Sequence, residues 1–405
     1  MTVAPDISTR VLLALAQALH EHGTPAHRLE DSLARVARAL ELHTAQFLST
    51  PTAMHLAFGD GAGQRVYLCR ATSERVDLAT LGQLDEIVDD IVAGRLAATG
   101  ALARLEALRT LGNRHSPRAK RWASATASGT AAVFLGGGLA ELVLASALGW
   151  VVGALAQWSA RMPRARPMHA PLAAFCVAVL VSLASAAAPG LSDGLVLVSA
   201  LIMLVPGLTL TVAMTELASG HVVSGTARLA GGMTLMFTIL FGAALGRPLA
   251  AALPVPVGWP LPALELPPGT WLACLAATTI AFTILLEARS RDAGWIAVAC
   301  GVGYGAARLG AWGLGPELGA FAGAVAVGLA SNAVARRFRR PATLMRLPGL
   351  LLLVPGSLGF RSLDSLLMAD TIAGTDGLFR VGLVTVALAT GLFAADLLLP
   401  TRRAL

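Results

Sequence analysis

The sequence predicts a mostly helical, polytopic membrane protein of about ten transmembrane helices in two inverted five-helix repeats, preceded by a small α+β domain. Three observations predict this fold. Of the 405 residues, 55% are hydrophobic and only 14% are charged, whereas about a quarter of the residues of a soluble protein are charged. Ten apolar segments follow residue 120. The region that holds them also repeats its own motifs.

The first part of the chain is polar and forms a separate domain, which we assign to residues 1–120. Residues 1–115 carry a net charge of −2, and the remainder carries +9. Residues 24–42 predict an amphipathic helix with Thr24 as its N-cap and Pro25 at its first position. The later segments predict two β-like stretches (44–60 and 63–73) around a Gly/Asp turn, then helical structure (77–108).

The polar domain contains five histidines, which raises the question of a metal or hydrolytic site. His20 and His22 point in different directions on a helix, and no H-E-x-x-H motif is present. The cysteines are scattered, with no C-x-x-C pair. We therefore expect no catalytic residues, no metal and no cofactor. A membrane-embedded enzyme that uses these histidines is the less favoured hypothesis. The five histidines are His20, His22, His27, His43 and His55.

The apolar segments are each close to the length that a helix needs to cross a bilayer. Ten spans place both ends of the membrane region on one side. Basic residues gather at the ends on the side of the polar domain, which predicts that both termini are cytoplasmic. The same bias explains the sequence pI of about 10.2 without a nucleic-acid partner. The segments are 122–140, 142–160, 171–189, 194–214, 227–246, 270–286, 293–309, 317–334, 346–362 and 378–398.

The apolar region is a duplication. "LAAFCVAVLVSLAS" at 172–185 returns as "LGAFAGAVAVGLAS" at 318–331, and "LVPG" at 204–207 returns at 353–356. Glu141 and Glu287 repeat at nearly the same offset, as do two Gly-Trp pairs. Because each copy holds five spans, the second must enter the membrane inverted. The predicted units are a first membrane repeat (121–250), a proline-rich external linker (251–269) and a second repeat (270–405).

The two "LVPG" motifs interrupt apolar helices at corresponding positions. Pro206 and Pro355 lack an N–H, and their rings crowd the carbonyl four residues earlier. A simple kink in a packed helix is the alternative interpretation of each proline. Inverted-repeat transporters, however, build their site from interrupted helices near the membrane midplane, which favours a functional role. The candidate pathway residues are Pro206, Gly207, Thr209, Thr211, Pro355, Gly356 and Ser357.

Ionisable residues near the spans are candidates for proton coupling or charge pairing. Glu216 follows the first break towards the inner face, and Asp396 lies near the end of the last span. Arg361 and Asp364 are three residues apart on a helix, so they are within reach of each other. Glu216 and Asp370 are also consistent with solvated helix ends. Buried charges in membranes tend to mark pathways.

The whole chain resembles the threonine/serine exporter family. The resemblance rests on residues 22–60 of the polar domain, on "ALIMLVPGLTLTVAMTELASGHVVSGTARLAGG" and on "LLLLVPGSLGFRSLDSLL". It implies export of L-threonine and L-serine across the bacterial inner membrane, driven by the proton motive force. Some relatives with separate halves are associated instead with dicarboxylate (succinate) export. No catalytic residues carry over, and a scaffold or signalling protein is a third hypothesis that the duplication disfavours.

The residues near the breaks favour an amino acid over a dicarboxylate as the substrate. Exposed helix N-termini suit a carboxylate, and freed carbonyls suit an ammonium group. Arg361 is the only cation that the sequence places near either break, whereas a dicarboxylate needs fixed positive charge. The expected partners are thus a small amino acid, protons and the lipid bilayer, with the oligomeric state left open. Hydroxyl groups that could bind the substrate belong to Thr209, Thr211, Thr215 and Ser357.

Overall fold

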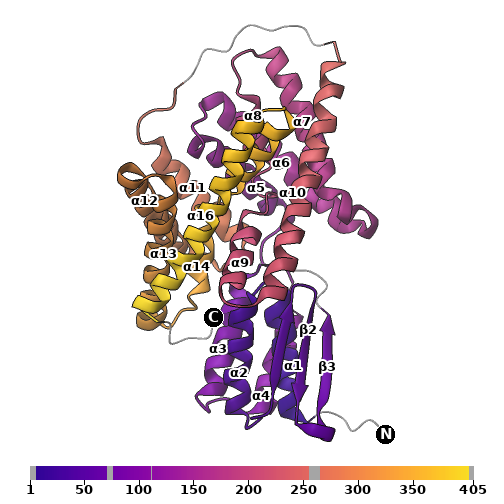
Figure 1. The fold of residues 1–405 in the computed structure, drawn as a ribbon, viewed down its shortest axis with the longest axis vertical. Helices are drawn as coiled ribbons and strands as arrows, with labels where there is room; N and C mark the ends of the chain where they lie inside the picture. Colours follow the sequence, from indigo (N-terminus) through magenta and orange to yellow (C-terminus); the bar gives the residue numbers. More distant parts are fainter. Residues whose placement is uncertain (1–5, 71–75, 111, 255–264, 401–405) are drawn as a thin grey trace.

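The structure is a computed structural model that describes residues 6–70, 76–110, 112–254 and 265–400. It consists of an N-terminal α+β domain, here called the N-domain, and a larger body of helices (Figure 1). The N-domain lies at one end of the helical body, next to the ends of α9 and α10. The expected linker falls mostly outside the described residues, since α10 ends at Ala251 and α11 begins at Thr270.

In the N-domain, α1 and α2 pack against a three-stranded antiparallel sheet in the order β1-β2-β3, and α3 and α4 pack on these two helices (Figure 1). The stretch expected to be β-like at 44–60 forms a hairpin of two strands rather than one. Met54 and Leu56 of β2 point into the core, because alternate residues of a strand face opposite sides. The elements are α1 (Ile7–Glu21), α2 (Ala26–Ala39), β1 (Gln46–Thr50), β2 (Ala53–Phe58), β3 (Arg65–Arg70), α3 (Leu78–Val92) and α4 (Ala98–Arg109), with a 3₁₀ turn η1 (Gly61–Gly63).

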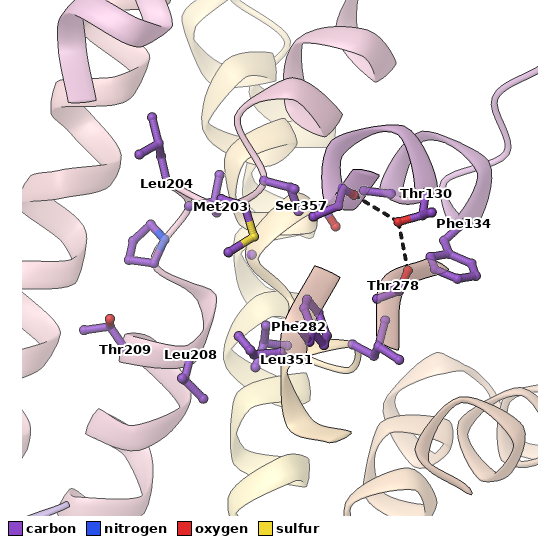
Figure 2. A pocket seen from close by; sticks show the side chains of 18 of the residues that line it. Thr130, Phe134, Met203, Leu204, Leu208, Thr209, Thr278, Phe282, Leu351 and Ser357 are labelled. Atoms are coloured by element: carbon purple, nitrogen blue, oxygen red, sulfur yellow. Dashed lines mark hydrogen bonds between the residues drawn. The ribbon is translucent and has the colours of Figure 1, made fainter. Parts of the chain in front are cut away.

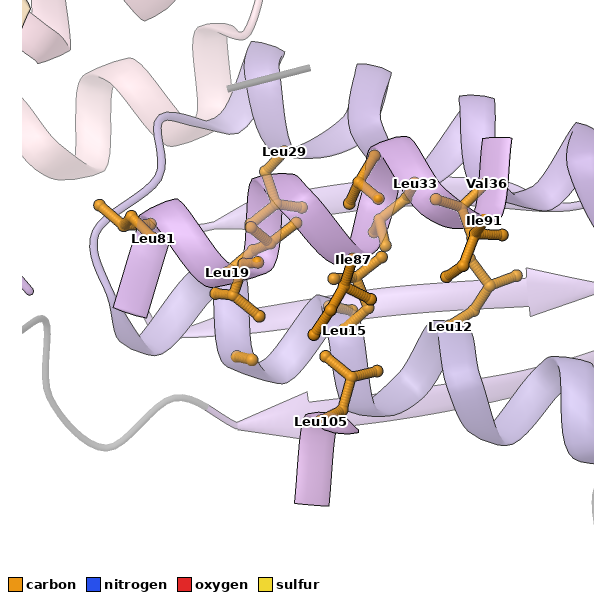
Figure 3. Close-up of a cluster of buried hydrophobic side chains, with 14 of the residues drawn as sticks. Leu12, Leu15, Leu19, Leu29, Leu33, Val36, Leu81, Ile87, Ile91 and Leu105 are labelled. Atoms are coloured by element: carbon orange, nitrogen blue, oxygen red, sulfur yellow. The ribbon is translucent and has the colours of Figure 1, made fainter. Parts of the chain in front are cut away.

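Leucines from several helices meet in the core of the N-domain (Figure 3). Leu12, Leu15 and Leu19 recur at helical spacing on α1, and all three are fully buried. Each buried leucine contributes roughly 1.5–3 kcal/mol. The same cluster continues into Phe282 and Leu286 of the helical body. The N-domain is therefore packed against that body rather than merely tethered to it.

The start of α2 differs from the sequence expectation. Pro25, not Thr24, is the N-cap residue, and the helix begins at Ala26. The Thr24 hydroxyl caps nothing and is buried without a partner among the described residues. The N–H of Ala26 is satisfied instead by Glu216 of the helical body, so a tertiary contact replaces the local cap.

The helical body repeats one order of elements. Three helices, a pair of short helices separated by a break, and a long helix occur twice in succession. Within each copy the long last helix packs against the third helix, α10 on α7 and α16 on α13. The first copy is α5 (Pro117–Phe134), α6 (Leu139–Arg161), α7 (His169–Ala187), α8 (Asp193–Ala200), α9 (Gly207–Ala218) and α10 (Val222–Ala251). The second is α11 (Thr270–Leu285), α12 (Ala293–Leu314), α13 (Pro316–Phe338), α14 (Thr343–Leu351), α15 (Gly356–Leu367) and α16 (Thr371–Leu398), and the connections hold two 3₁₀ turns, η2 (Pro163–Met168) and η3 (Ser290–Asp292).

The first helices of the two copies run in opposite directions. α5 leaves the N-domain, whereas α11 ends beside it, where Leu286 accepts a hydrogen bond from the Leu78 N–H. Glu287, after α11, accepts hydrogen bonds from the N–H groups of Arg114 and His115. An inverted duplication requires this opposition, but the relation of the complete repeats remains a prediction.

Six helical segments of the described chain are long and apolar enough to cross a membrane, by length and composition. One of them, Thr343–Leu367, joins α14 and α15 across the second break. Each of the ten segments predicted from the sequence falls on one helix or on one broken pair. The short helices α9 and α11 are apolar but below spanning length. The number of about ten spans thus remains a prediction, and the coarser conclusion is a helical membrane protein. The six are Leu139–Arg161, Pro163–Ala187, Val222–Ala251, Pro316–Phe338, Thr343–Leu367 and Thr371–Leu398.

Candidate functional site

The two Pro-Gly motifs adopt nearly the same local structure. Pro206 is the N-cap of α9 with φ −80° and ψ 43°, and Pro355 is the N-cap of α15 with φ −82° and ψ 33°. Each proline therefore ends one short helix and begins the next, because its ring cannot continue the helix before it. The motifs are true breaks rather than bends within one continuous helix.

The two breaks touch each other. A Cβ added to Gly207 would lie 3.0 Å from the backbone N and Cα atoms of Gly356, and 2.9 Å from a methyl group of Val354. Conversely, a Cβ on Gly356 would lie 3.3 Å from the Cα of Gly207. Only glycine at both positions lets the backbones approach this closely. Residues 149 positions apart in the sequence thus meet at one point.

The breaks leave backbone groups without partners. Within the described part of the chain, the carbonyl oxygens of Ile202, Met203 and Leu204 accept no backbone hydrogen bond. The same holds for the carbonyl of Leu351, which the proline ring of the second break frees. The Gly207 N–H at the start of α9 donates to the Val205 carbonyl at 2.8 Å. Among the described residues, the next two N–H groups of α9 and the first three of α15 donate no backbone hydrogen bond, as is usual at a helix N-terminus. Backbone hydrogen-bond donors and acceptors are therefore both available beside the breaks.

A cavity of about 390 Å³ lies between the breaks (Figure 2). The hydroxyls of Thr209 and Ser357 line it, one from each copy, and neither makes a hydrogen bond to the described residues. Thr278 donates a hydrogen bond of 2.8 Å to the Thr130 hydroxyl on the same wall. The remaining lining is apolar and includes Phe134, Met203, Phe282 and Leu351. This cavity, here called the break cavity, has the size of a small organic solute and no charged lining residue.

A second cavity of about 430 Å³ adjoins the first on the side of the N-domain. The two cavities share Met203, Leu208 and Thr209 among their lining residues. We call this second space the junction cavity, since the N-domain, α9, α14 and α16 all contribute to it. Its polar and charged lining residues are His27, Arg28, Thr209, Thr211, Thr215, Arg228, Thr343, Arg346 and Asp396.

Glu216 is fully buried rather than solvated at a helix end. Its carboxylate accepts hydrogen bonds from the Ala26 N–H at 2.9 Å, from the Ser224 hydroxyl at 2.9 Å and from Arg228 Nε at 3.1 Å. The Ala26 contact places the N-terminus of α2 on this carboxylate, which the helix dipole favours. His221 and Glu30 form a further pair at 3.3 Å across the same boundary. The candidate residue Glu216 thus joins the N-domain to the first broken helix.

The expected pair of Arg361 and Asp364 does not form. Asp364 pairs instead with Arg247 of α10 in a bidentate arrangement at 2.7 and 2.8 Å, a geometry that planar guanidinium groups favour. Arg361 is exposed. The reason is tertiary: α10 and α15 pack together, so a partner from the other copy displaces the neighbour on the same helix. Asp370 caps α16 by accepting from the Ala373 N–H at 3.1 Å.

Asp396 is half-buried and lies at the centre of a polar network with buried partners. It accepts hydrogen bonds from Arg346 and from Asn332, and Arg346 also binds the Asn332 amide oxygen at 2.7 Å. Arg28 of the N-domain lies 3.7 Å from the carboxylate. The statement that Arg361 is the only cation near a break is therefore wrong, since Arg346 and Arg228 line the junction cavity. The partner of Arg346, Asp396, lies 50 positions away on another helix, so no local pattern reveals this pair.

The sequence-predicted pathway residues fall at two places. Pro206, Thr209, Gly356 and Ser357 line the break cavity, and Thr211 lines the junction cavity. Gly207 forms the contact between the breaks, next to Pro355. Sequence reasoning missed Thr130 and Thr278. They lie 148 positions apart, close to the offset of the "LVPG" motifs, and this repetition was the signal that could have revealed them.

His27 and Glu287, which lie outside the spans, have shifted pKa values that decide their charge at neutral pH. Burial, together with the neighbouring His221 and Arg346, lowers the pKa of His27 to about 4, although Asp396 acts in the opposite direction. Burial alone would raise the pKa of Glu287, but Lys120 and two backbone N–H groups outweigh it and lower the pKa. His27 is thus neutral and Glu287 is ionised at neutral pH.

The N-domain histidines do not gather into one site. His20 and His22 bind the backbone carbonyls of Pro51 and Ala18, and His27 faces His221 at a ring distance of 6.2 Å. Within the described ranges, no group of three His, Cys, Asp or Glu side chains is placed to hold a metal ion.

Long apolar helices, two interrupted helices that meet, and a solute-sized cavity between them define a membrane protein of the transport class. Residues 10–249 match a family model described as "Putative threonine/serine exporter", and residues 271–398 match one described as "Threonine/Serine exporter, ThrE". The chain belongs to the threonine/serine exporter family.

Curated relatives include a bacterial protein and several fungal ones. The "Probable threonine/serine exporter" of Mycobacterium tuberculosis is 24% identical over 97% of this chain and 77% of its own length. "Pheromone-regulated membrane protein 10" of Pichia sorbitophila is 24% identical over 59% of this chain and 24% of that protein. An uncharacterized protein of Schizosaccharomyces pombe is 25% identical over 59% of this chain and 32% of that protein. The chain thus spans about a quarter to a third of these fungal relatives, and no solved structure matches it.

Proposed function

We propose that this protein exports small amino acids, L-threonine and L-serine, across the bacterial inner membrane, driven by the proton motive force. The observation that carries the proposal is the meeting of the two breaks beside a cavity with no charged lining residue. Family membership and the bacterial relative named as a threonine/serine exporter support the substrate class. We assign the N-domain and both termini to the cytoplasm, and the distribution of basic residues supports this assignment.

The break cavity suits a zwitterion that carries a hydroxyl group. The unpaired N–H groups at the starts of α9 and α15 suit a carboxylate. The free carbonyls of residues 202–204 suit an ammonium group, and Thr209 and Ser357 provide unpaired hydroxyls for the substrate side chain. An uncharged wall favours a solute without net charge, because an unbalanced charge in a low-dielectric cavity is costly.

Proton coupling is assigned to three buried or half-buried carboxylates, each of which faces an arginine. Glu216 pairs with Arg228, Asp364 with Arg247, and Asp396 with Arg346. Protonation of such a carboxylate releases its arginine and weakens the contact between the elements that the pair joins. A proton gradient thereby acts on helix packing around the cavities.

Export of a dicarboxylate such as succinate is the alternative. The observation that favours it is the positive charge of the junction cavity, where Arg28, Arg228 and Arg346 all contribute to the lining. Two of these arginines form close ion pairs with carboxylates, which reduces the charge available for a second carboxylate. Threonine or serine therefore remains the first choice.

Efflux from exporter-deficient bacteria loaded with threonine-, serine- or succinate-releasing precursors tests the proposal. We expect wild-type protein to speed the efflux of threonine and serine, and an uncoupler to abolish the gain. Thr209→Val removes one hydroxyl from the cavity and should slow export per molecule about three- to tenfold, the range of one hydrogen bond. Thr234→Val, on an exposed face of α10, is the matched control. Efflux of succinate alone would reject the amino-acid assignment.

A further inference from the structure

The junction cavity is enclosed by separate parts of the chain. The N-domain supplies Pro25, His27 and Arg28, and the helical body supplies α9 with residues of α14 and α16. The predicted candidates Thr209, Thr211 and Asp396 line this space, but the sequence did not indicate that the N-domain closes it. It exists only while the N-domain is docked on the helices.

Buried polar atoms around the junction cavity lack hydrogen-bond partners. Arg346 Nε, the Thr343 hydroxyl and His27 Nδ1 are all buried without a partner among the described residues. Arg346 and Thr343 are only 7% and 9% exposed. An unsatisfied buried polar group costs about 1–3 kcal/mol, and native structures contain few of them. Three on residues that line one cavity indicate that a bound polar group completes their bonding.

The charge balance of the cavity points to an anionic group. Three arginines line it, against one lining carboxylate, Asp396. Glu216 compensates Arg228 from just outside the lining. Among the described residues, the one carboxylate near Arg28 is that of Asp396, at a long distance of 3.7 Å, and Arg346 binds this carboxylate at shorter range. One positive charge thus remains to be balanced.

Acceptor groups lie on the α9 side of the same cavity. The Thr211 and Thr215 hydroxyls donate their protons to the carbonyls of Gly207 and Thr211 within the helix. Their oxygen lone pairs are therefore left to accept hydrogen bonds. Donors on one side and acceptors on the other match a solute with a carboxylate at one end and a donor group at the other.

We propose that the junction cavity is a second binding site, specific for the carboxylate group of a small solute held by Arg28, Arg346 and Thr343. The choice of solutes rests on the proposed export function, but the site itself rests on the unsatisfied groups and the charge balance. Because the junction and break cavities share Met203 and Thr209, a solute here lies next to the breaks. Because Arg28 belongs to the N-domain, binding and N-domain docking stabilise each other.

Isothermal titration of the purified full-length protein with L-threonine, succinate and ethanolamine tests the site. Ethanolamine lacks a carboxylate, so we expect heat from the first two solutes only. Arg28→Gln should raise the dissociation constant at least tenfold, since it removes a charged donor. Arg35→Gln is the matched control, because Arg35 lies on the same helix with a similarly long ion pair, at 4.0 Å, and away from the cavity.

Thr343→Val is a second variant, in which a loss of binding is not explained by a loss of folding stability. The Thr343 hydroxyl makes no hydrogen bond to the described residues, so the melting temperature should not fall, while binding weakens about three- to tenfold. Thr385→Val removes a buried hydroxyl that is satisfied within its own helix, and binding should change less than twofold. Wild-type affinity in both Arg28→Gln and Thr343→Val, or equal binding of ethanolamine, would overturn the site.

Hydrogen exchange separates this site from the break cavity. Saturating L-threonine or succinate should slow exchange of the amides at the start of α2, residues 26–30, in wild type but not in Arg28→Gln. Unchanged exchange there, despite measurable binding, would place the solute elsewhere. If threonine is not exported but binding still depends on the carboxylate and on Arg28, the proposed function is rejected and the junction site is retained. If threonine is exported but this binding is not seen, the junction site is rejected and the proposed function is retained.

Discussion

Gly207 is the residue at which the two halves of the protein meet. Its missing side chain lets the backbone of Gly356 approach to a distance that any Cβ would obstruct. Gly207→Ala should therefore separate the breaks and lower threonine export at least tenfold per molecule. Gly231→Ala, where an added Cβ meets nothing within 4 Å, should leave export unchanged. Equal activity of the two variants would show that the breaks need no close contact.

His27 makes the docking of the N-domain sensitive to acid. Its pKa in the folded protein is about 4, below the ordinary value of about 6.5. As the pH falls from about 6.5 to 4, His27 becomes protonated in the unfolded or undocked chain but stays neutral in the docked form. The docked form therefore becomes less stable relative to the undocked or unfolded chain. Above pH 7 both forms are neutral at this site, and no effect is expected.

The melting temperature at pH 7.5, 6 and 5 measures this effect. We expect wild type to lose more thermal stability over that range than His27→Gln, which carries no proton to bind. The difference between the two proteins isolates His27 from the other groups that titrate. Parallel pH profiles would contradict the assignment.

At the scale of the elements, the two prolines define the site. Pro206→Ala and Pro355→Ala restore the missing N–H and allow each broken helix to close over its freed carbonyl. We expect both variants to reduce transport more than they reduce protein abundance. The measurement is threonine efflux divided by the amount of protein in the membrane. Wild-type rates per molecule in both variants would mean that the prolines only kink packed helices.

Helix positions followed from the sequence, whereas side-chain partners did not. The ten apolar segments and both breaks could be read from hydropathy and from the repeated "LVPG", because these signals are local. The partner of Asp364 could not, since Arg247 lies 117 positions away and is brought near only by packing of α10 on α15. The burial of Glu216 was also hidden, because Ala26 reaches it from another domain. The spacing of three residues favoured Arg361 as the partner of Asp364, but tertiary packing brings Arg247 to the carboxylate instead.

At the scale of the whole molecule, the docked N-domain and the distribution of basic residues predict one orientation in the membrane, with the N-domain on the cytoplasmic side. A single cysteine at the exposed position Arg337, in a protein without its native cysteines, should resist a membrane-impermeant maleimide added to intact cells. Ser192→Cys, exposed at the opposite end of the body, should react. Labelling in the reverse pattern would invert the proposed topology and place the N-domain outside.

The central claim is that the two breaks together hold the transported solute. The most direct measurement is an electron cryomicroscopy map of the full-length protein in lipid nanodiscs with saturating L-threonine. We predict density for the amino acid between residues 203–209 and 351–357, with its hydroxyl group near Thr209 or Ser357. A map of equal quality with the break cavity empty, from protein shown to export threonine, would contradict the account.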